Sequence, residues 1–408
     1  MQPYILKRKK SPFEDIGFSD TVTHIQLAVK IDEPKIVPEL VNQIKRNFLP
    51  LNIYETKEEL IYKKGCSPIL QLPNNIKDCK SACDWIYENR QLESVGMATL
   101  AHNNEYIALT ANHMIGDGGL LKSVIDLLQN QTQLKYSSPL PIAPDEAMYE
   151  DLVNLDKNVL SVYPEQLTNV VSKFKPSEKI GEECRYALDQ IDVNKLTEGN
   201  LTDKLWTALL LSMAAYNGKI NRWGIATCID MRPRTNLALT WSNCCFFSIL
   251  SHTAPVLQNQ TVGDVANALR KDMQRRLNNN EMSSFLRISE SYYENEGLSA
   301  EISNVGSVEL RKPLTDAWMQ IRFNEKNNPS VLSLLTFGIK DQTRNDLILR
   351  LRYPPCRMKD EEADVILKGI KHSVYNIPQN TKVQDALDEL KKFEAQYAKS
   401  KNYNIKFD

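Results

Sequence analysis

The feature that most constrains the fold is a strand-like run that passes directly into a histidine and then into a helix. Residues Glu105–Asn112 form an apolar run, and His113 follows it immediately. Asp117 comes four residues after the histidine, and glycines then open a helix-like segment, Leu120–Leu128. A strand, a short turn and a helix in this order predict layered α/β structure with polar side chains at the end of a strand.

The same mixture of strands and helices continues along the chain. Residues 22–32 alternate like a half-buried strand, and the apolar stripe after them predicts a helix from Pro38 to Phe48. Thr202 and Thr261 are suited to cap later helices. Strict βαβ alternation is missing, so we expect mixed sheets flanked by helices. In the second half the expected strands are 184–188, 223–229, 245–250 and the hairpin 331–339 with 347–353, and the expected helices are 203–216, 262–279, 361–375 and 383–397.

The length of the chain and its proline- and glycine-containing segments predict two domains. The chain has 408 residues, which suits two domains of about 200 residues each. Three prolines within residues 136–148 indicate extended surface chain, and residues 176–183 are polar and contain glycine. We therefore expect an N-terminal domain at residues 1–175, a linker at 176–183 and a C-terminal domain at 184–408.

Composition excludes several classes of protein. Hydrophobic residues make up 42% of the chain and charged residues 25%, as in ordinary globular proteins. The formal net charge of −1 gives no reason to expect nucleic acid as a partner. We find neither a transmembrane run nor a signal-peptide core, and the eight cysteines lack metal-site spacing. These observations predict a cytoplasmic protein without a metal site.

His113 is the candidate catalytic residue. A histidine at a strand end is a natural general base, because the pKa of an imidazole lies near neutral pH. Asp117 allows two interpretations: it forms an ion pair with an arginine and ties the loop down, or it is a plain N-cap of the following helix. Gly118 and Gly119 would leave room for substrate beside the histidine, or would permit positive φ. The simpler alternative is that His113 is only structural.

With its flanking segments, this motif resembles the CoA-dependent acyltransferase superfamily. That group includes chloramphenicol acetyltransferase, the condensation domains of peptide synthetases, BAHD acyltransferases and fungal alcohol acetyltransferases. Ile229–Arg234 followed by Trp241–Asn243 looks like the Asp-x-Arg … Gly-Asn element of BAHD enzymes. Ile302–Gly306 resembles the Ser-Asn-x-Gly strand of other members, and the hairpin Leu332–Tyr353 matches their usual C-terminal region.

The sequence departs from the family patterns at three points, and the second and third narrow the resemblance to one branch. Ser242 replaces the glycine before the asparagine, and the Asp-Phe-Gly-Trp-Gly motif of BAHD proteins is missing from the sequence. Asn112 stands where most condensation domains have a second histidine. The pattern is therefore most similar to the alcohol acetyltransferase-like group.

The resemblance implies two chloramphenicol acetyltransferase-like domains that form a pseudo-dimer, with a tunnel between them and His113 at its middle. Arg232 is the implied ion-pair partner of Asp117, and Arg234 is the second candidate. For both arginines the alternative is a solvated loop after a strand.

Three residues are implied to contact substrate. Ser303 and Asn304 would donate to the oxyanion or to the acceptor, although a strand-end turn closed by Gly306 explains them equally well. Asn243 would help to hold the loop near the tunnel.

The implied reaction moves an acyl group from a CoA thioester directly to a hydroxyl acceptor, with His113 as general base. Acetyl is the first candidate for the acyl group. Acyl-CoA would be a co-substrate, and no cofactor would be bound permanently. We expect a monomer that acts on small molecules. The alternatives are amide formation from an amine acceptor or a carrier-bound thioester, and a non-catalytic family member that binds a ligand or partner.

Overall fold

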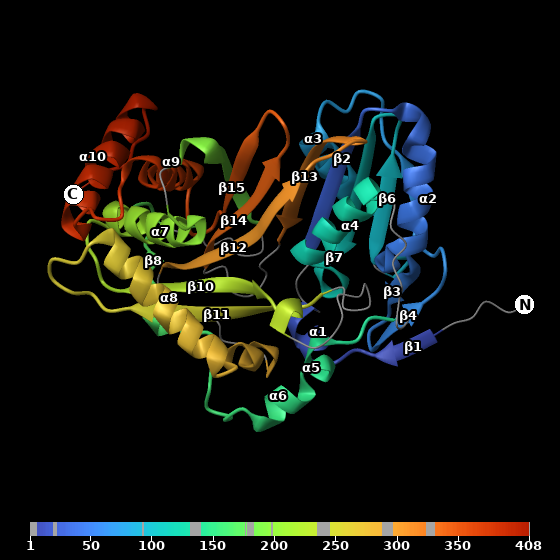
Figure 1. Ribbon diagram of the computed structural model, residues 1–408, viewed down its shortest axis with the longest axis horizontal. Helices are drawn as coiled ribbons and strands as arrows, with labels where there is room; N and C mark the ends of the chain where they lie inside the picture. Colours follow the sequence, from blue (N-terminus) through green and yellow to red (C-terminus); the bar gives the residue numbers. More distant parts are fainter. Residues whose placement is uncertain are drawn as a thin grey trace, which may run out of the picture.

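The computed structural model shows two layered α/β halves that lie side by side (Figure 1). Each half is built on a mixed sheet with helices packed against it, which confirms the expected fold class. The residues that the structure describes are 6–18, 23–91, 94–130, 140–175, 177, 183–196, 199–234, 245–287, 297–323 and 331–407.

The first half centres on a five-stranded sheet in the order β13-β2-β7-β6-β5. Helices α2 and α4 cover one face, where Leu40, Val124 and Leu27 belong to one hydrophobic cluster, and α3 covers the other face. Both faces are covered, so β7 is buried along its whole length instead of alternating between buried and exposed residues. The elements are β2 His24–Ile31, α2 Val37–Asn47, β5 Ile69–Gln71, α3 Cys79–Glu88, β6 Ala98–His102, β7 Tyr106–Asn112, α4 Gly118–Asn130 and β13 Leu314–Arg322.

A smaller three-stranded sheet and several short helices pack below this layer. The sheet has the order β1-β4-β3. Phe13 of α1 meets Phe246 and Phe285 in a separate hydrophobic cluster. The elements are β1 Leu6–Lys9, α1 Pro12–Phe18, β3 Ile53–Glu55, β4 Glu59–Tyr62, α5 Pro144–Ala147, α6 Tyr149–Asn154 and the 3₁₀ helices Pro34–Ile36, Leu49–Asn52 and Pro164–Gln166.

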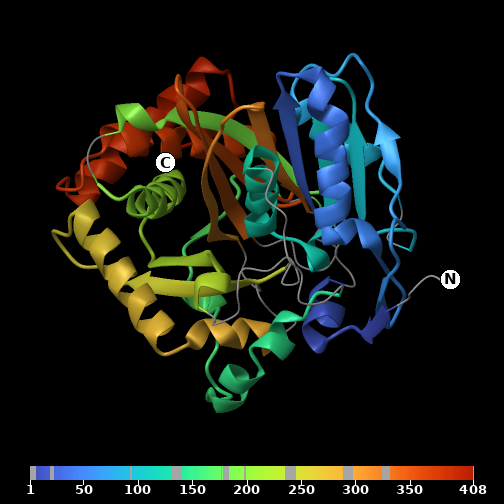
Figure 2. The same ribbon diagram turned by 45° about the vertical axis from the view of Figure 1, so that its right-hand side comes forward.

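The second half is a seven-stranded sheet in the order β11-β10-β12-β14-β15-β9, with β8 paired to β12. Its helices lie on the side away from the first half, as Figures 1 and 2 show, and they bury the largest core of the protein. The elements are β8 Asn169–Val170, β9 Arg185–Asp192, α7 Leu201–Asn217, β10 Trp223–Asp230, β11 Phe247–Ala254, α8 Val262–Asn278, β12 Leu298–Glu309, β14 Val331–Lys340, β15 Asn345–Tyr353, α9 Asp360–Asn376, α10 Val383–Ser400 and the 3₁₀ helices Val193–Lys195, Arg232–Arg234 and Glu281–Arg287.

The two halves exchange strands. Strand β13 comes from the second half of the chain but pairs with β2 in the first sheet, with Trp318 opposite Ala28. Strand β8 comes from the first half but pairs with β12 in the second sheet. Each of the two sheets therefore contains a strand from the other half of the chain. The division into domains at residues 1–175 and 184–408 stays a prediction.

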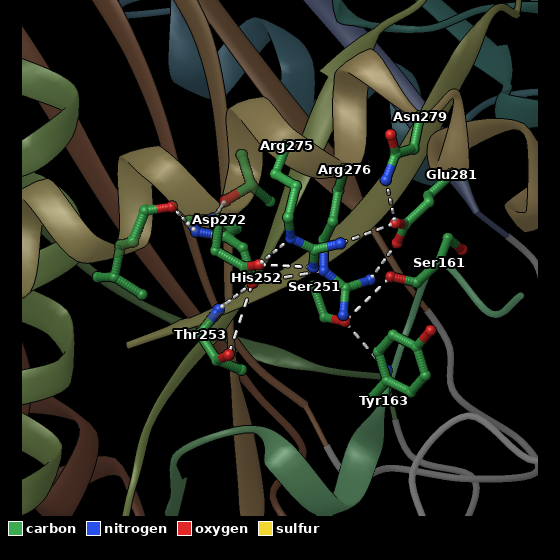
Figure 3. Close-up of polar contacts among 12 residues, drawn as sticks. Ser161, Tyr163, Ser251, His252, Thr253, Asp272, Arg275, Arg276, Asn279 and Glu281 are labelled. Carbon is green, nitrogen blue, oxygen red and sulfur yellow. Dashed lines mark hydrogen bonds and ion pairs between the residues drawn. The ribbon is translucent and has the colours of Figure 1, made fainter. Parts of the chain in front are cut away.

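A polar network fastens α8 to the edge of the second sheet (Figure 3). Asp272 accepts a hydrogen bond from Thr253 N at 2.9 Å, and Arg276 donates to Glu281 at 3.0 Å. Ser251 of β11 donates to the carbonyl of Ser161 at 3.0 Å and ties in the incoming loop. The network holds β11 in place two strands away from β12.

Most of the elements expected from the sequence form, with shifted ends. Thr261 caps α8 in a capping box, as predicted. The prediction for Thr202 was wrong: Asn200 caps α7, and its side chain accepts from Thr202 N and Asp203 N. Two residues of helix were therefore missed, because Asn and Thr are both good caps. Residues 245–250 were expected as a strand, but β11 begins at Phe247 and runs to Ala254.

Candidate functional site

The His113 motif lies at the junction of β7 and α4. After β7, residues His113–Ile115 form one turn of 3₁₀ helix, and Asn112 caps that turn by accepting from Met114 N at 2.8 Å. The backbone N–H of His113 donates to the carbonyl of Thr23 at 2.8 Å. These bonds fix the backbone on both sides of the histidine, so its imidazole leaves a rigid edge of the sheet.

The His113 imidazole is half-buried among sulfur and aromatic groups. Its Nδ1 lies 3.8 Å from Sγ of Cys245, and its ring centroid lies 5.1 Å from that of Phe247. Burial lowers the pKa of His113 below its ordinary value, and hydrogen bonds to the backbone together with the charge of Asp117 only partly oppose this. A lowered pKa keeps the ring neutral at pH 7, which is the form that accepts a proton.

Among the described residues, no hydrogen bond joins Asp117 to the ring of His113. Asp117 instead holds three segments of the chain together. Its carboxylate accepts from Leu120 N at 3.0 Å, from Phe246 N at 2.7 Å and from Nη2 of Arg232 at 2.9 Å. The structure thus brings Asp117 and Arg232 together, and the carboxylate also caps α4. Asp117 therefore has both of the roles considered from the sequence: it forms an ion pair with an arginine, and it caps the helix that follows.

Arg232 is as buried as its partner, at 6% side-chain exposure against 4% for Asp117. Burial alone would lower the pKa of Arg232, but the charges of Asp117 and Asp230 outweigh it and raise that pKa. Asp230 accepts from both the backbone N and the Nη1 of Arg232, each at 3.0 Å. The guanidinium therefore stays charged and stays in one place.

Two residues make contacts that the sequence did not predict. Asp230 was expected only as part of the Asp-x-Arg segment, and Gly119 was expected, like Gly118, to leave room for substrate or to permit positive φ. Asp230 is the second carboxylate of the pair, and its signal was its place two residues before Arg232. Gly119 leaves space for the guanidinium, because a Cβ there would come 2.8 Å from Nη1 of Arg232. The doubled glycine after Asp117 was the only signal for this second role.

Gly118 allows close packing between the motif and the second sheet. A Cβ at Gly118 would come 2.8 Å from Cγ2 of Val305 on β12. The position thus lets α4 begin against β12, and clearance for a substrate stays a prediction.

The segment with Ser303 and Asn304 lies on β12, just before an irregularity in its pairing with β14. Asn304 Oδ1 accepts from Gly306 N at 2.9 Å, and Gly306 has a φ of +84°. This geometry fits the turn closed by Gly306 that the sequence offered as the alternative, and contact of Ser303 or Asn304 with substrate stays a prediction. Ser303 lies beside Cys228 of β10, where a hydrogen bond between them lowers the pKa of the thiol that burial otherwise raises.

The structure describes neither Asn243 nor the side chain of Arg234, although the sequence placed both in the site. Asn243 falls outside the described residues, as do Trp241 and Ser242. The backbone of Arg234 ends the short helix after β10, but its side chain is not among those described.

The described residues contain no group of three or more His, Cys, Asp or Glu side chains placed to hold a metal ion. No helix within the described ranges is both long enough and apolar enough to cross a membrane.

Solved structures with the same fold include a polyketide synthase associated protein, condensation domains and an O-acetyltransferase. Polyketide synthase associated protein 5 from Mycobacterium tuberculosis superposes with a TM-score of 0.63 at 12% identity, covering 90% of this chain and 97% of that one. The condensation domain of the monacolin K polyketide synthase gives 0.62 at 10% identity, covering 93% and 99%. Trichothecene 15-O-acetyltransferase from Fusarium sporotrichioides gives 0.59 at 12% identity, covering 91% and 95%.

These likenesses establish the fold over nearly the whole chain, and they confirm the fold that the sequence resemblance implied. No protein-family model matches the sequence, and no curated protein matches it as a relative.

Proposed function

We propose that this protein is an acyltransferase that moves an acyl group from a CoA thioester to a hydroxyl acceptor, with acetyl as the first candidate for the acyl group. The observation that carries the proposal is a half-buried imidazole with a lowered pKa, fixed beside a buried Asp117–Arg232 ion pair. One neighbour of the same fold is titled an O-acetyltransferase and another a condensation domain, and these titles support the proposal.

In the proposed reaction both substrates are bound together. The imidazole of His113 takes the proton of the acceptor hydroxyl as its oxygen attacks the thioester carbonyl. The tetrahedral intermediate then collapses, the C–S bond breaks, and the imidazolium returns its proton to the CoA thiolate. Ser303, Asn304 and Asn243 are the proposed contacts to substrate, and such donors act by stabilising the oxyanion.

Each remaining residue has a proposed positioning role. Asp117 and Arg232 hold the loop that carries His113, with Arg234 as the second basic residue of the segment. Gly118 keeps space beside the base. We propose further that substrates enter a tunnel between two domains, residues 1–175 and 184–408, and that the protein acts as a monomer in the cytoplasm with acyl-CoA as its only co-substrate.

The experiment is a thiol-release assay. The protein is incubated with acetyl-CoA and matched panels of alcohols and amines, and free CoA is measured. We expect release with an alcohol, and we expect His113→Ala to lower it by about 10²–10⁴-fold. His102→Ala is the matched control, because His102 is a half-buried histidine at the end of β6.

Three outcomes decide between the alternatives. Release only with amines would replace the hydroxyl acceptor by amide formation. Release that is the same in the His113→Ala variant would refute His113 as the base. Binding of acetyl-CoA without release for any acceptor would favour a non-catalytic ligand-binding protein.

A further inference from the structure

One face of the second sheet is directed at the His113 motif. Val305 on β12 lies against Gly118, at the start of α4. Because side chains alternate along a strand, Glu301 and Ser303 share the face of Val305. The register carries this face onto the neighbouring strands, since Ser303 pairs with Leu335 and Leu335 with Arg350.

A second set of residues that pair across the same three strands, two residues away along each strand, confirms which side chains lie on this face. Glu301 pairs with Ser333, and Ser333 pairs with Arg352. Ser333 Oγ donates to Glu301 at 2.6 Å, and Arg352 Nη2 lies 3.5 Å from the same carboxylate. Arg350, two residues before Arg352 on β15, therefore lies on this polar face as well.

Arg350 is a buried charge that forms no ion pair with a carboxylate among the described residues, and Asp84 acts on it only through its charge. Its side chain is 4% exposed, and its guanidinium stacks on the ring of Tyr186 at 4.2 Å. Among the described residues, Nε and Nη1 of Arg350 have no hydrogen-bond partner, and neither does the buried hydroxyl of Tyr186. Burial lowers the pKa of Arg350 to about 10, so the group stays charged at neutral pH.

The neighbouring arginines differ, because each has a carboxylate. Arg352 has Glu301, and Arg322 has Asp84 at 2.6 Å. Asp84 is already engaged by Lys80 at 2.7 Å and by Gln320 at 3.0 Å. A buried charge left without a counter-ion is strongly destabilising, and buried charges in proteins are ordinarily paired. A bound anion would supply the missing partner.

We propose that Arg350 and Tyr186 bind a carboxylate group carried by one of the two substrates. This rests on the proposed acyl transfer and deepens it by naming the substrate class. The guanidinium fork matches a carboxylate, and the phenol supplies a further donor. Arg350 lies two strand spacings from Ser303, about 10 Å across the sheet. The CoA phosphates lie further than this from the thioester, beyond the pantetheine arm, which favours a carboxylate close to the reacting atoms.

The first test measures binding without turnover. Thermal unfolding is followed with hexanoate, hexanol and inorganic phosphate as probes, in wild type, Arg350→Met and Tyr186→Phe. We expect hexanoate to raise the Tm of wild type, Tyr186→Phe to reduce the shift, and Arg350→Met to abolish it. Arg185→Met is the control, because Arg185 is an exposed arginine on the adjacent strand β9.

Two results would overturn the proposal. An equal hexanoate shift in wild type and in both variants would mean that Arg350 and Tyr186 are not the site. A shift with phosphate but none with hexanoate would assign Arg350 to a phosphate instead of a carboxylate. Tyr186→Phe keeps the test decisive where Arg350→Met does not fold.

Kinetics then identify the substrate that carries the carboxylate. If it is the acceptor, Arg350→Met raises KM for ω-hydroxyhexanoate by about 10–100-fold more than it raises KM for hexanol. If it is the acyl group, the same change appears for succinyl-CoA against acetyl-CoA. Equal effects on charged and uncharged substrates would refute the proposal. A hexanoate shift that depends on Arg350, in a protein that transfers no acyl group, would refute the proposed reaction and leave the carboxylate site standing.

Discussion

Both carboxylate oxygens of Asp117 accept hydrogen bonds from Nη2 of Arg232, at 3.0 and 2.9 Å, across 115 residues of sequence. The same carboxylate also accepts from the backbone N–H of Phe246. One buried side chain therefore joins the start of α4, the segment after β10 and the segment before β11. The loop that carries His113 depends on this junction for its position.

Removing the charge of Asp117 should damage stability and activity together. We expect Asp117→Asn to cost about 3 kcal/mol of unfolding free energy, the lower end for breaking a buried pair, because Asp230 still binds Arg232. A displaced loop should also reduce turnover by about 100-fold. Urea unfolding and the thiol-release assay measure the two effects. Asp126→Asn, on the exposed face of α4, is the control, and normal stability in Asp117→Asn would remove the structural role from Asp117.

Gly119 should be intolerant of a methyl group because of Arg232. A Cβ at this position would come 2.8 Å from Nη1 of the guanidinium and 3.3 Å from Oδ1 of Asp117. We expect Gly119→Ala to destabilise the protein by about 1–3 kcal/mol despite the better helix propensity of alanine. In an Arg232→Ala background the same change should cost nothing, since the space is then open. A double-mutant cycle measures this coupling, and additive effects would show that the close contact does not matter.

The sequence predicts local structure well and long-range pairing poorly. The strand before His113, the helix after it and the Thr261 cap all form as expected, because each depends on residues that are neighbours in the chain. The exchange of β13 into the first sheet was not predicted. Its pairing with β2 joins residues about three-quarters of the chain apart, and no periodicity encodes that partner.

The same limit applies to the candidate site. Arg232 was named as the partner of Asp117 only through the family resemblance, since spacing alone does not select it. The contact of Phe246 N with Asp117 uses a backbone group, which carries no sequence signal. Arg350 stands in a strand that reads as an ordinary hairpin arm, and its lack of a carboxylate becomes visible only when four strands are aligned.

His252 should make the protein sensitive to acid. It is fully buried, with Nε2 2.8 Å from Thr227 Oγ1 and Nδ1 3.1 Å from the carbonyl of Leu269, and burial lowers its pKa to about 4. Protonation favours the unfolded chain, where the pKa is near 6.5. Stability is therefore complete above pH 6.5 and falls as the pH drops from 6.5 to 4, by on the order of 3 kcal/mol.

Urea unfolding at a series of pH values tests this. His252→Gln keeps a polar side chain but cannot titrate, so its stability should fall much less over the same range than that of wild type. Parallel curves for the two proteins would show that other groups cause the acid sensitivity, with His113 the first candidate because its pKa is also lowered.

The rate of acyl transfer should reach its plateau at a lower pH than a free imidazole would allow. The active form of His113 as a base is the neutral ring, so activity rises with pH as the ring loses its proton. Burial lowers the pKa of His113, and the charge of Arg352 acts in the same direction. We therefore expect the acid limb of kcat/KM to lie below pH 6.5, with full activity at pH 7. The profile is measured with an uncharged alcohol as acceptor, so that only groups of the enzyme and of acetyl-CoA titrate. An acid limb centred above pH 6.5 would contradict the described surroundings of the ring, and an unchanged limb in His113→Ala would assign the titration to another group.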